Sequence, residues 1–67
     1  MVRVHFVVVL KNKGTGEVFL DTEIVEAENV SKAKAYLVDS FKGSRLYEFL
    51  TCRVGKLITF DAVERIN

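Results

Sequence analysis

The sequence predicts a small α+β fold, in which one helix packs on one face of an antiparallel sheet. Near both ends of the chain, apolar residues show the alternation or the short runs that are typical of strands. Between them lies one segment with the period of a helix. Turns that contain glycine separate these segments. The predicted order is therefore β-β-α-β, followed by a fourth strand.

The first two strands are predicted to form a hairpin. One alternating set of the first strand is fully apolar: Val2, Val4, Phe6, Val8 and Leu10. The other set is mixed: Arg3, His5, Val7, Val9 and Lys11. Residues 12–16 form a turn cluster of the length that joins hairpin strands. In the second strand, residues 17–27, one face is expected to carry Val18, Leu20, Thr22 and Ile24, and the other Phe19, Asp21, Glu23 and Val25.

A helix is predicted over residues 30–42. Its expected core stripe has helical spacing: Val30, Ala33, Tyr36, Leu37, Ser40 and Phe41. Asn29 or Ser31 can cap its first turn, because a short side-chain oxygen accepts a hydrogen bond from a free backbone N–H. At the other end, Lys42 suits the negative end of the helix dipole, and Gly43 suits a left-handed exit.

After the helix, the sequence predicts a second hairpin. Two apolar runs, residues 46–54 and 57–60, are separated by Gly55 and Lys56, a pair that fits a two-residue turn with glycine first. The segment 61–64 has two interpretations. Its spacing fits the start of a short helix, and it equally fits a strand that continues through a bulge. The strand is the favoured interpretation.

The predicted sheet carries more apolar residues than a single helix can cover. The fully apolar set of the first strand is expected under the helix, since one helix covers one face. Four apolar residues are then expected on the opposite face: Val7, Val9, Phe19 and Val25. Such a surface is typical of a site that another protein chain covers, and its expected polar rim is Arg3, His5, Asp21 and Glu23. Two alternatives stay open: the second strand has the reverse register, or the C-terminal segment covers this face.

Length and composition limit the class of protein. The 67 residues fit one domain over positions 1–67, expected to be a complete small gene product. With one cysteine, Cys52, and one histidine, His5, the chain offers neither an internal disulfide nor the ligands of a cysteine–histidine metal site. The lack of a disulfide framework favours a reducing compartment, so the cytoplasm is the expected location. The apolar run 6–10 is too short for a signal peptide or a membrane span.

The sequence contains no recognisable catalytic constellation, and no enzyme activity, cofactor or metal is predicted. Cys52 is interpreted as a small buried side chain and His5 as a strand residue, because nothing in the pattern activates the thiol. The acidic stretch 17–28 contains no base, so it is interpreted as a solvated face or a partner-binding edge. Residues 14–16 form a hairpin turn, because they lack the helix start and the lysine of a phosphate loop.

A nucleic-acid interface is the alternative binding hypothesis. Its candidate residues are Lys32, Lys34, Lys42 and Arg45, with Tyr36 and Tyr47 as candidate stacking groups. The net charge of +1 gives little support, and a lysine-rich outer face is ordinary for a helix. Tyr36 also lies on the expected core stripe. This hypothesis is therefore ranked second.

Several short segments resemble small phage-encoded β-β-α-β proteins, in particular the Dmd-type antitoxins that block RNA-cleaving host toxins. The resemblance lies in Val2-Arg3-Val4, Lys11-Asn12, Thr22-Glu23-Ile24 and the tyrosine-bearing helix. A second segment is similar to the archaeal ribosomal LX type, through Val25, Ala27, Asn29, Ala33 and Ala35. That family is more basic than this chain. The similarities cover roughly the first half of the chain and assign no functional residue.

The leading functional hypothesis is a non-enzymatic protein-binding module. The phage resemblance implies an inhibitor or modulator of a host protein, because small phage proteins of this size usually act in that way. The expected partner is another protein chain, either a host protein or a second copy of this one, and no membrane or metal is expected. The alternative is a small RNA- or ribosome-associated binding domain.

Overall fold

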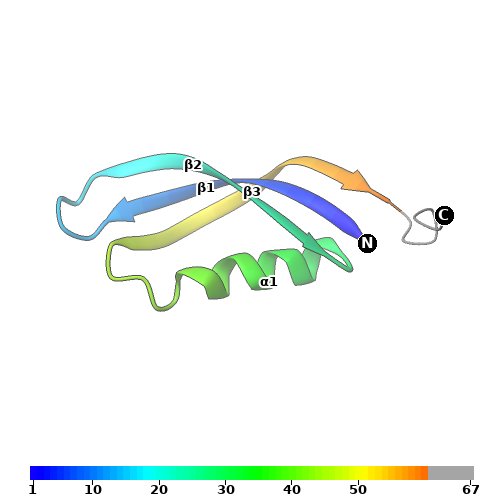
Figure 1. Ribbon diagram of the computed structural model, residues 1–67. Helices are drawn as coiled ribbons and strands as arrows, with labels where there is room; N and C mark the ends of the chain where they lie inside the picture. Colours follow the sequence, from blue (N-terminus) through cyan, green and yellow to red (C-terminus); the bar gives the residue numbers. More distant parts are fainter. Residues whose placement is uncertain (61–67) are drawn as a thin grey trace.

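Three strands and one helix make up the described part of the chain, residues 1–60 of the computed structural model. They are β1 (Val2–Asn12), β2 (Val18–Ala27), α1 (Val30–Phe41) and β3 (Tyr47–Thr59). The strands form one antiparallel sheet in the order β2-β1-β3, and α1 lies along one face of it (Figure 1). This confirms the predicted α+β class and its β-β-α-β order.

The core lies between β1 and α1. Alternate residues of β1 are buried: Val2, Val4, Phe6, Val8 and Leu10. Ala33 and Leu37 of α1 pack into the same cluster and are 0% and 2% exposed. The fully apolar side of the first strand therefore lies under the helix, as predicted. A strand of 11 residues spans about 36 Å and a helix of 12 residues about 18 Å, so α1 covers only part of β1.

Aromatic side chains extend the core toward the β1–β2 turn. The rings of Phe19 in β2 and Tyr47 in β3 meet edge to face, with 5.5 Å between their centroids. The ring of Phe41, at the end of α1, lies 5.9 Å from that of Phe49 in β3. These pairs connect both outer strands and the helix around the buried end of β1, and such pairs add about 0.5–1.5 kcal/mol beyond their buried area.

Asn12 builds the turn of the first hairpin. Its side-chain Oδ1 accepts hydrogen bonds from the backbone N–H groups of Gly14 (2.8 Å) and Thr15 (3.1 Å). Its own backbone N–H donates to the carbonyl of Glu17 at 2.7 Å. Gly16 has a φ of 79°, in the left-handed region that glycine adopts without steric cost. The turn lies where the sequence predicts it, and its length fixes which residues of β1 and β2 face each other.

α1 begins at the predicted cap. The side-chain oxygen of Asn29 accepts a hydrogen bond from the backbone N–H of Lys32 at 2.8 Å. The helix ends at Phe41, one residue earlier than predicted. The left-handed exit expected at Gly43 is wrong, because its φ is not positive. Instead, the N–H of Lys42 donates to the carbonyl of Asp39 at 3.1 Å, which closes the last turn, and the N–H of Ser44 donates to the carbonyl of Phe41 at 3.1 Å in the turn that follows.

The predicted core stripe of α1 is wrong at Tyr36 and at Ser40, since Tyr36 is 56% exposed and Ser40 is exposed as well. The position of Tyr36 is about 100° around the helix from buried Leu37, which places its ring at the side of the helix.

Among residues 1–60, α1 is too short and too polar to span a membrane, and it is the one helix described there.

β3 runs without a turn over its 13 residues, so the predicted second hairpin is wrong. Gly55 and Lys56 lie inside this strand, and residues 57–60 do not form a fourth strand. β2 pairs with only one side of β1, and β3 pairs with the whole of the other side. This long ladder satisfies more backbone groups than a short hairpin would. The predicted segment at 61–64 lies outside the described residues.

Two bulges let β3 follow β1 along its full length. Gly55 is the extra residue of one bulge, between the paired residues Val54 and Lys56. A Cβ at Gly55 would lie 3.2 Å from Cγ2 of Val7, so glycine allows a close approach here. Leu50 is the extra residue of the other bulge. Glycine thus marks a strand bulge at a point where its sequence context suggested a turn.

The packing predicts different effects at two neighbouring helix positions. Leu37→Ala removes a fully buried side chain and should lower the free energy of unfolding by about 2–5 kcal/mol. Tyr36→Ala, the matched control, should lower it by less than about 1 kcal/mol, because this ring is mostly solvated. Urea unfolding followed by circular dichroism measures both. Equal losses would show that the helix is rotated about its axis, with Tyr36 as close to the core as Leu37.

Candidate functional site

The side of the sheet away from α1, which we call the open face, is the candidate binding surface. Its members follow from the register, because residues opposite each other share a face. β1 contributes Arg3, His5, Val7, Val9 and Lys11. β2 contributes Val18, Leu20, Thr22, Ile24 and Glu26, and β3 contributes Glu48, Thr51, Arg53, Lys56 and Ile58.

The register corrects half of the predicted site. Val7, Val9, Arg3 and His5 lie on the open face, but the four residues predicted from β2 lie on the side of α1: Phe19, Asp21, Glu23 and Val25. Phe19 is opposite Leu10 and Val25 is opposite Val4, and both pack against the core. One of the two alternatives that the sequence leaves open, the reverse register of the second strand, is therefore confirmed. The other concerns the C-terminal segment, which lies outside the described residues.

The length of the turn is the physical reason for this correction. Val2 pairs with Ala27 and Lys11 with Val18, so the numbers of facing residues always add to 29 (2 + 27, 11 + 18). An odd sum pairs every even-numbered residue of β1 with an odd-numbered residue of β2. Because the even-numbered residues of β1 are buried, Phe19 lies on the side of α1, and its neighbours Val18 and Leu20 lie on the open face. Turn length was the signal that could have identified Leu20 and Ile24 from the sequence.

The centre of the open face is apolar and solvent-exposed. Leu20 is 69% exposed and Ile24 is 57% exposed, beside the half-buried Val7 and Val9 of β1. A hollow of about 210 Å³ opens here, and it is lined by Val7, Val9, Leu20, Thr51, Cys52 and Arg53. An apolar centre with a hollow of this size can accept a side chain of another protein.

The charge on the open face is uneven. The guanidinium of Arg3 is held by Glu26 at 2.7 Å, and it also lies over the ring of Phe60, 5.8 Å from the centroid. Arg53 and Lys56 of β3 make no ion pair within residues 1–60. Within residues 1–60, the β3 side of the face therefore presents two basic groups without an ion pair, Arg53 and Lys56, together with the acidic Glu48.

His5 and Cys52 do not come together. His5 lies on the open face opposite Ile24, whereas Cys52 lies opposite buried Val8, on the side of α1. His5 Nε2 is buried and has no hydrogen-bond partner within residues 1–60. No group of three metal-binding side chains occurs in that same part of the chain.

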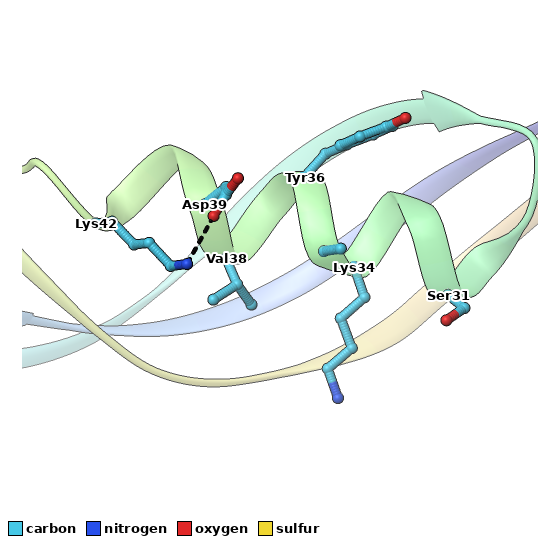
Figure 2. Close-up of a pocket in the computed structure, with 7 residues that line it drawn as sticks. Ser31, Lys34, Tyr36, Val38, Asp39 and Lys42 are labelled. Atoms are coloured by element: carbon cyan, nitrogen blue, oxygen red, sulfur yellow. Dashed lines mark ion pairs between the residues drawn. The ribbon is translucent and has the colours of Figure 1, made fainter.

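Two of the four basic residues of the nucleic-acid hypothesis, Lys32 and Lys42, are engaged in ion pairs. Lys32 pairs with Glu28 at 3.1 Å and Lys42 with Asp39 at 2.9 Å. Figure 2 shows the second of these pairs, with Lys34 and Tyr36 projecting from opposite sides of α1. Arg45 lies in the segment between α1 and β3.

An open hollow of about 500 Å³ runs along α1 (Figure 2). Its lining is mixed: Ser31, Lys34, Ala35, Tyr36, Val38, Asp39 and Lys42. The stacking group Tyr47, half-buried, is already packed against Phe19. The hollow combines one lysine with one internally paired lysine, which is a weak phosphate-binding arrangement.

A smaller apolar surface lies on the α1 side of β3. Val54 and Leu57 are 43% and 47% exposed there, although they lie opposite Phe6 and Val4 of the core strand. This surface adjoins the end of the described chain at Phe60. No site is assigned to it.

Comparisons of the chain with protein-family models, curated proteins and solved structures found no match in any of the three. The resemblance to Dmd-type antitoxins and to the ribosomal LX type therefore stays a prediction.

The register predicts opposite outcomes for two adjacent residues of β2. Leu20→Asp places a charge on the exposed open face and should change the free energy of unfolding by less than about 1 kcal/mol. Phe19→Asp places the same charge against the core and should cost more than about 3 kcal/mol. Thermal unfolding of the two variants checks this. If Leu20→Asp lowered the melting temperature more than Phe19→Asp, the register first suggested by the sequence would be the right one.

Proposed function

We propose that the protein is a non-enzymatic binding module that docks the open face of its sheet on another protein. The observation that carries the proposal is the exposed apolar centre around Leu20 and Ile24. Apolar side chains that lie together on a protein surface usually mark an interaction site. A regular sheet supports them, so little conformational entropy is lost when a partner docks.

The partner that best fits this face has an apolar patch flanked by carboxylates. Its apolar part would cover Leu20, Ile24 and the valines of β1. Its carboxylates would lie over Arg53 and Lys56, which are unpaired within residues 1–60. Charge complementarity of this kind mainly increases the association rate and the specificity. A second copy of the chain fits less well, because two open faces would each present the same basic side.

The size of the open face suits a modest protein–protein interface. Three strands about 4.8 Å apart and up to about 36 Å long give a flat area of roughly 500 Å². Projecting side chains increase this value toward the roughly 800 Å² per partner of a standard complex. The proposal therefore requires a partner that uses most of the face and not the 210 Å³ hollow alone.

The biological role that agrees with this surface is inhibition or modulation of the partner by occupying its surface. Such a role needs a complementary face and no reacting group on the small protein. The assignment to a phage and a host protein rests on the resemblance in sequence, and binding through the open face does not depend on it.

Site-specific photocrosslinking followed by affinity measurement tests the proposal. A photoreactive residue at position 20 should capture a partner in cells, and the same residue at position 36, on the side of α1, should not. The captured protein is then purified, and its affinity for the wild-type chain is measured by calorimetry. Leu20→Asp should weaken binding by roughly 10–100-fold and Arg53→Glu by roughly 3–30-fold. Tyr36→Asp is the matched control and should bind like the wild type.

Three results would contradict the proposal. The first is a partner whose affinity is unchanged by Leu20→Asp and by Arg53→Glu. The second is light scattering that gives a stable dimer which Leu20→Asp dissociates, because the occupant of the face would then be a second copy. The third is capture that disappears after nuclease treatment, which would favour the RNA- or ribosome-associated alternative.

A further inference from the structure

We propose that the free edge of β2 binds an extended segment of another protein as an additional strand, and that this segment carries lysine or arginine at every second position. This edge is distinct from the open face, whose role rests on apolar exposure. The inference depends on three features of β2: the direction of its backbone groups, its regularity and its two carboxylates that have no ion pair within residues 1–60.

The first feature is that β2 directs a row of backbone groups out of the sheet. The N–H of Asn12 donates to the carbonyl of Glu17, which shows that odd-numbered residues next to β2 bond toward β1. Backbone direction alternates along a strand, and β2 has no register shift. The backbone groups of Leu20, Thr22 and Ile24 therefore point outward. The N–H of Thr22 is bonded only locally, by the carboxylate of Asp21 at 2.8 Å.

The second feature is that β2 is the regular edge of this sheet. The other edge, β3, is interrupted by bulges at Leu50 and Gly55 and carries Arg53 and Lys56. Bulges and lysines are the devices by which proteins protect sheet edges against further pairing. β2 has ten residues without a bulge, a proline or a lysine. It is thus the edge on which another strand pairs without distortion.

The third feature is the distribution of charge along β2. Glu26 is neutralised by Arg3, and Glu28, just beyond the strand, is paired with Lys32. Asp21 and Glu23 have no ion pair within residues 1–60. They lie two residues apart on the side of α1, about 6.6 Å along the strand. A basic residue on an added strand, directly across from each carboxylate, would meet a charge that has no ion pair within residues 1–60.

These features define the sequence of the segment. Opposite Asp21 and Glu23 it carries two basic residues separated by one position. Opposite Leu20 and Ile24, whose side chains are on the other face, it carries apolar residues. The pattern is apolar, basic, any, basic, apolar. A second copy of β2 does not fit, because antiparallel pairing about Thr22 would place Asp21 opposite Glu23, and like charges repel.

Peptide binding to the full chain tests the inference. The probe is a fluorescein-labelled nine-residue peptide with Val-Lys-Thr-Lys-Val at its centre, and binding is followed by fluorescence anisotropy. The double variant D21K/E23K should lose at least tenfold in affinity for it and should instead bind the peptide with glutamate in place of lysine. N-methylation of the peptide residues opposite Leu20, Thr22 and Ile24, which are the two valines and the threonine, should abolish binding, since it removes the backbone donors that face β2. In the wild-type chain, amide NMR shifts should change most at Leu20, Thr22 and Ile24.

Controls separate this edge from the open face. Arg53→Glu should leave peptide binding unchanged, because Arg53 lies on β3. Peptide binding therefore tests the edge of β2 alone, and a peptide that fails to bind does not contradict docking through the open face. A partner that fails to bind the open face likewise does not contradict peptide binding at the edge. If D21K/E23K is not folded by circular dichroism, D21N/E23Q replaces it and should weaken peptide binding. The inference is overturned by an unsaturated titration up to about 1 mM peptide. Equal affinity of the lysine peptide for the wild type and for D21K/E23K would overturn it as well. So would amide NMR shifts that change most in β3 or α1.

Discussion

β1 pairs on both sides, and these two ladders determine the position of every other element. One ladder joins β1 to β2 and the other joins it to β3, so β1 is the inner strand and both partners are edges. Its buried side is apolar from Val2 to Leu10. Once this side is covered by α1, the register of each ladder decides which side chains of the edge strands join the core and which form the open face.

The two edges of the sheet have different physical characters as a result. β3 follows β1 only by means of two bulges, at Leu50 and Gly55, and it presents Arg53 and Lys56 on the open face. β2 follows β1 without interruption and keeps two carboxylates unpaired within residues 1–60. The proposed docking on the open face uses the apolar centre and the basic side. The proposed strand addition uses the regular, acidic edge. The two proposals share Leu20 and Ile24 but depend on different charged groups, Arg53 and Lys56 in the first and Asp21 and Glu23 in the second.

Much of the fold could be predicted from local patterns. The alternation in β1, the Asn12 turn and the Asn29 cap each act within a few residues. The sequence predicts the first two in their observed places and offers Asn29 as one of two possible caps. The end of β3 could not be predicted in that way. A Gly-Lys pair between apolar runs is compatible with a turn or with a bulge, and the choice depends on the free side of β1, which is distant in sequence.

Only part of the candidate site could be predicted, again because pairing between residues distant in sequence decides the rest. Val7 and Val9 follow from the pattern of β1 alone, but the residues beside them depend on the β1–β2 register. A one-residue change in register moves every side chain of a strand to the other face, so an error there exchanged Leu20 and Ile24 for Phe19 and Val25. Tyr36 was misplaced because it lies at the border of the helical stripe, where spacing alone does not separate core from surface.

The central claim is the register of β1 and β2, and Hα–Hα contacts in a nuclear Overhauser spectrum recorded in D2O test it most directly. In antiparallel pairs without mutual hydrogen bonds the two Cα atoms are only about 4.5 Å apart, and their Hα atoms give strong cross-peaks. This register predicts such cross-peaks for Val7 with Thr22 and for Val9 with Leu20. Strong cross-peaks of Val7 with Asp21 or Glu23 would contradict it, because a register of that kind places Phe19 on the open face.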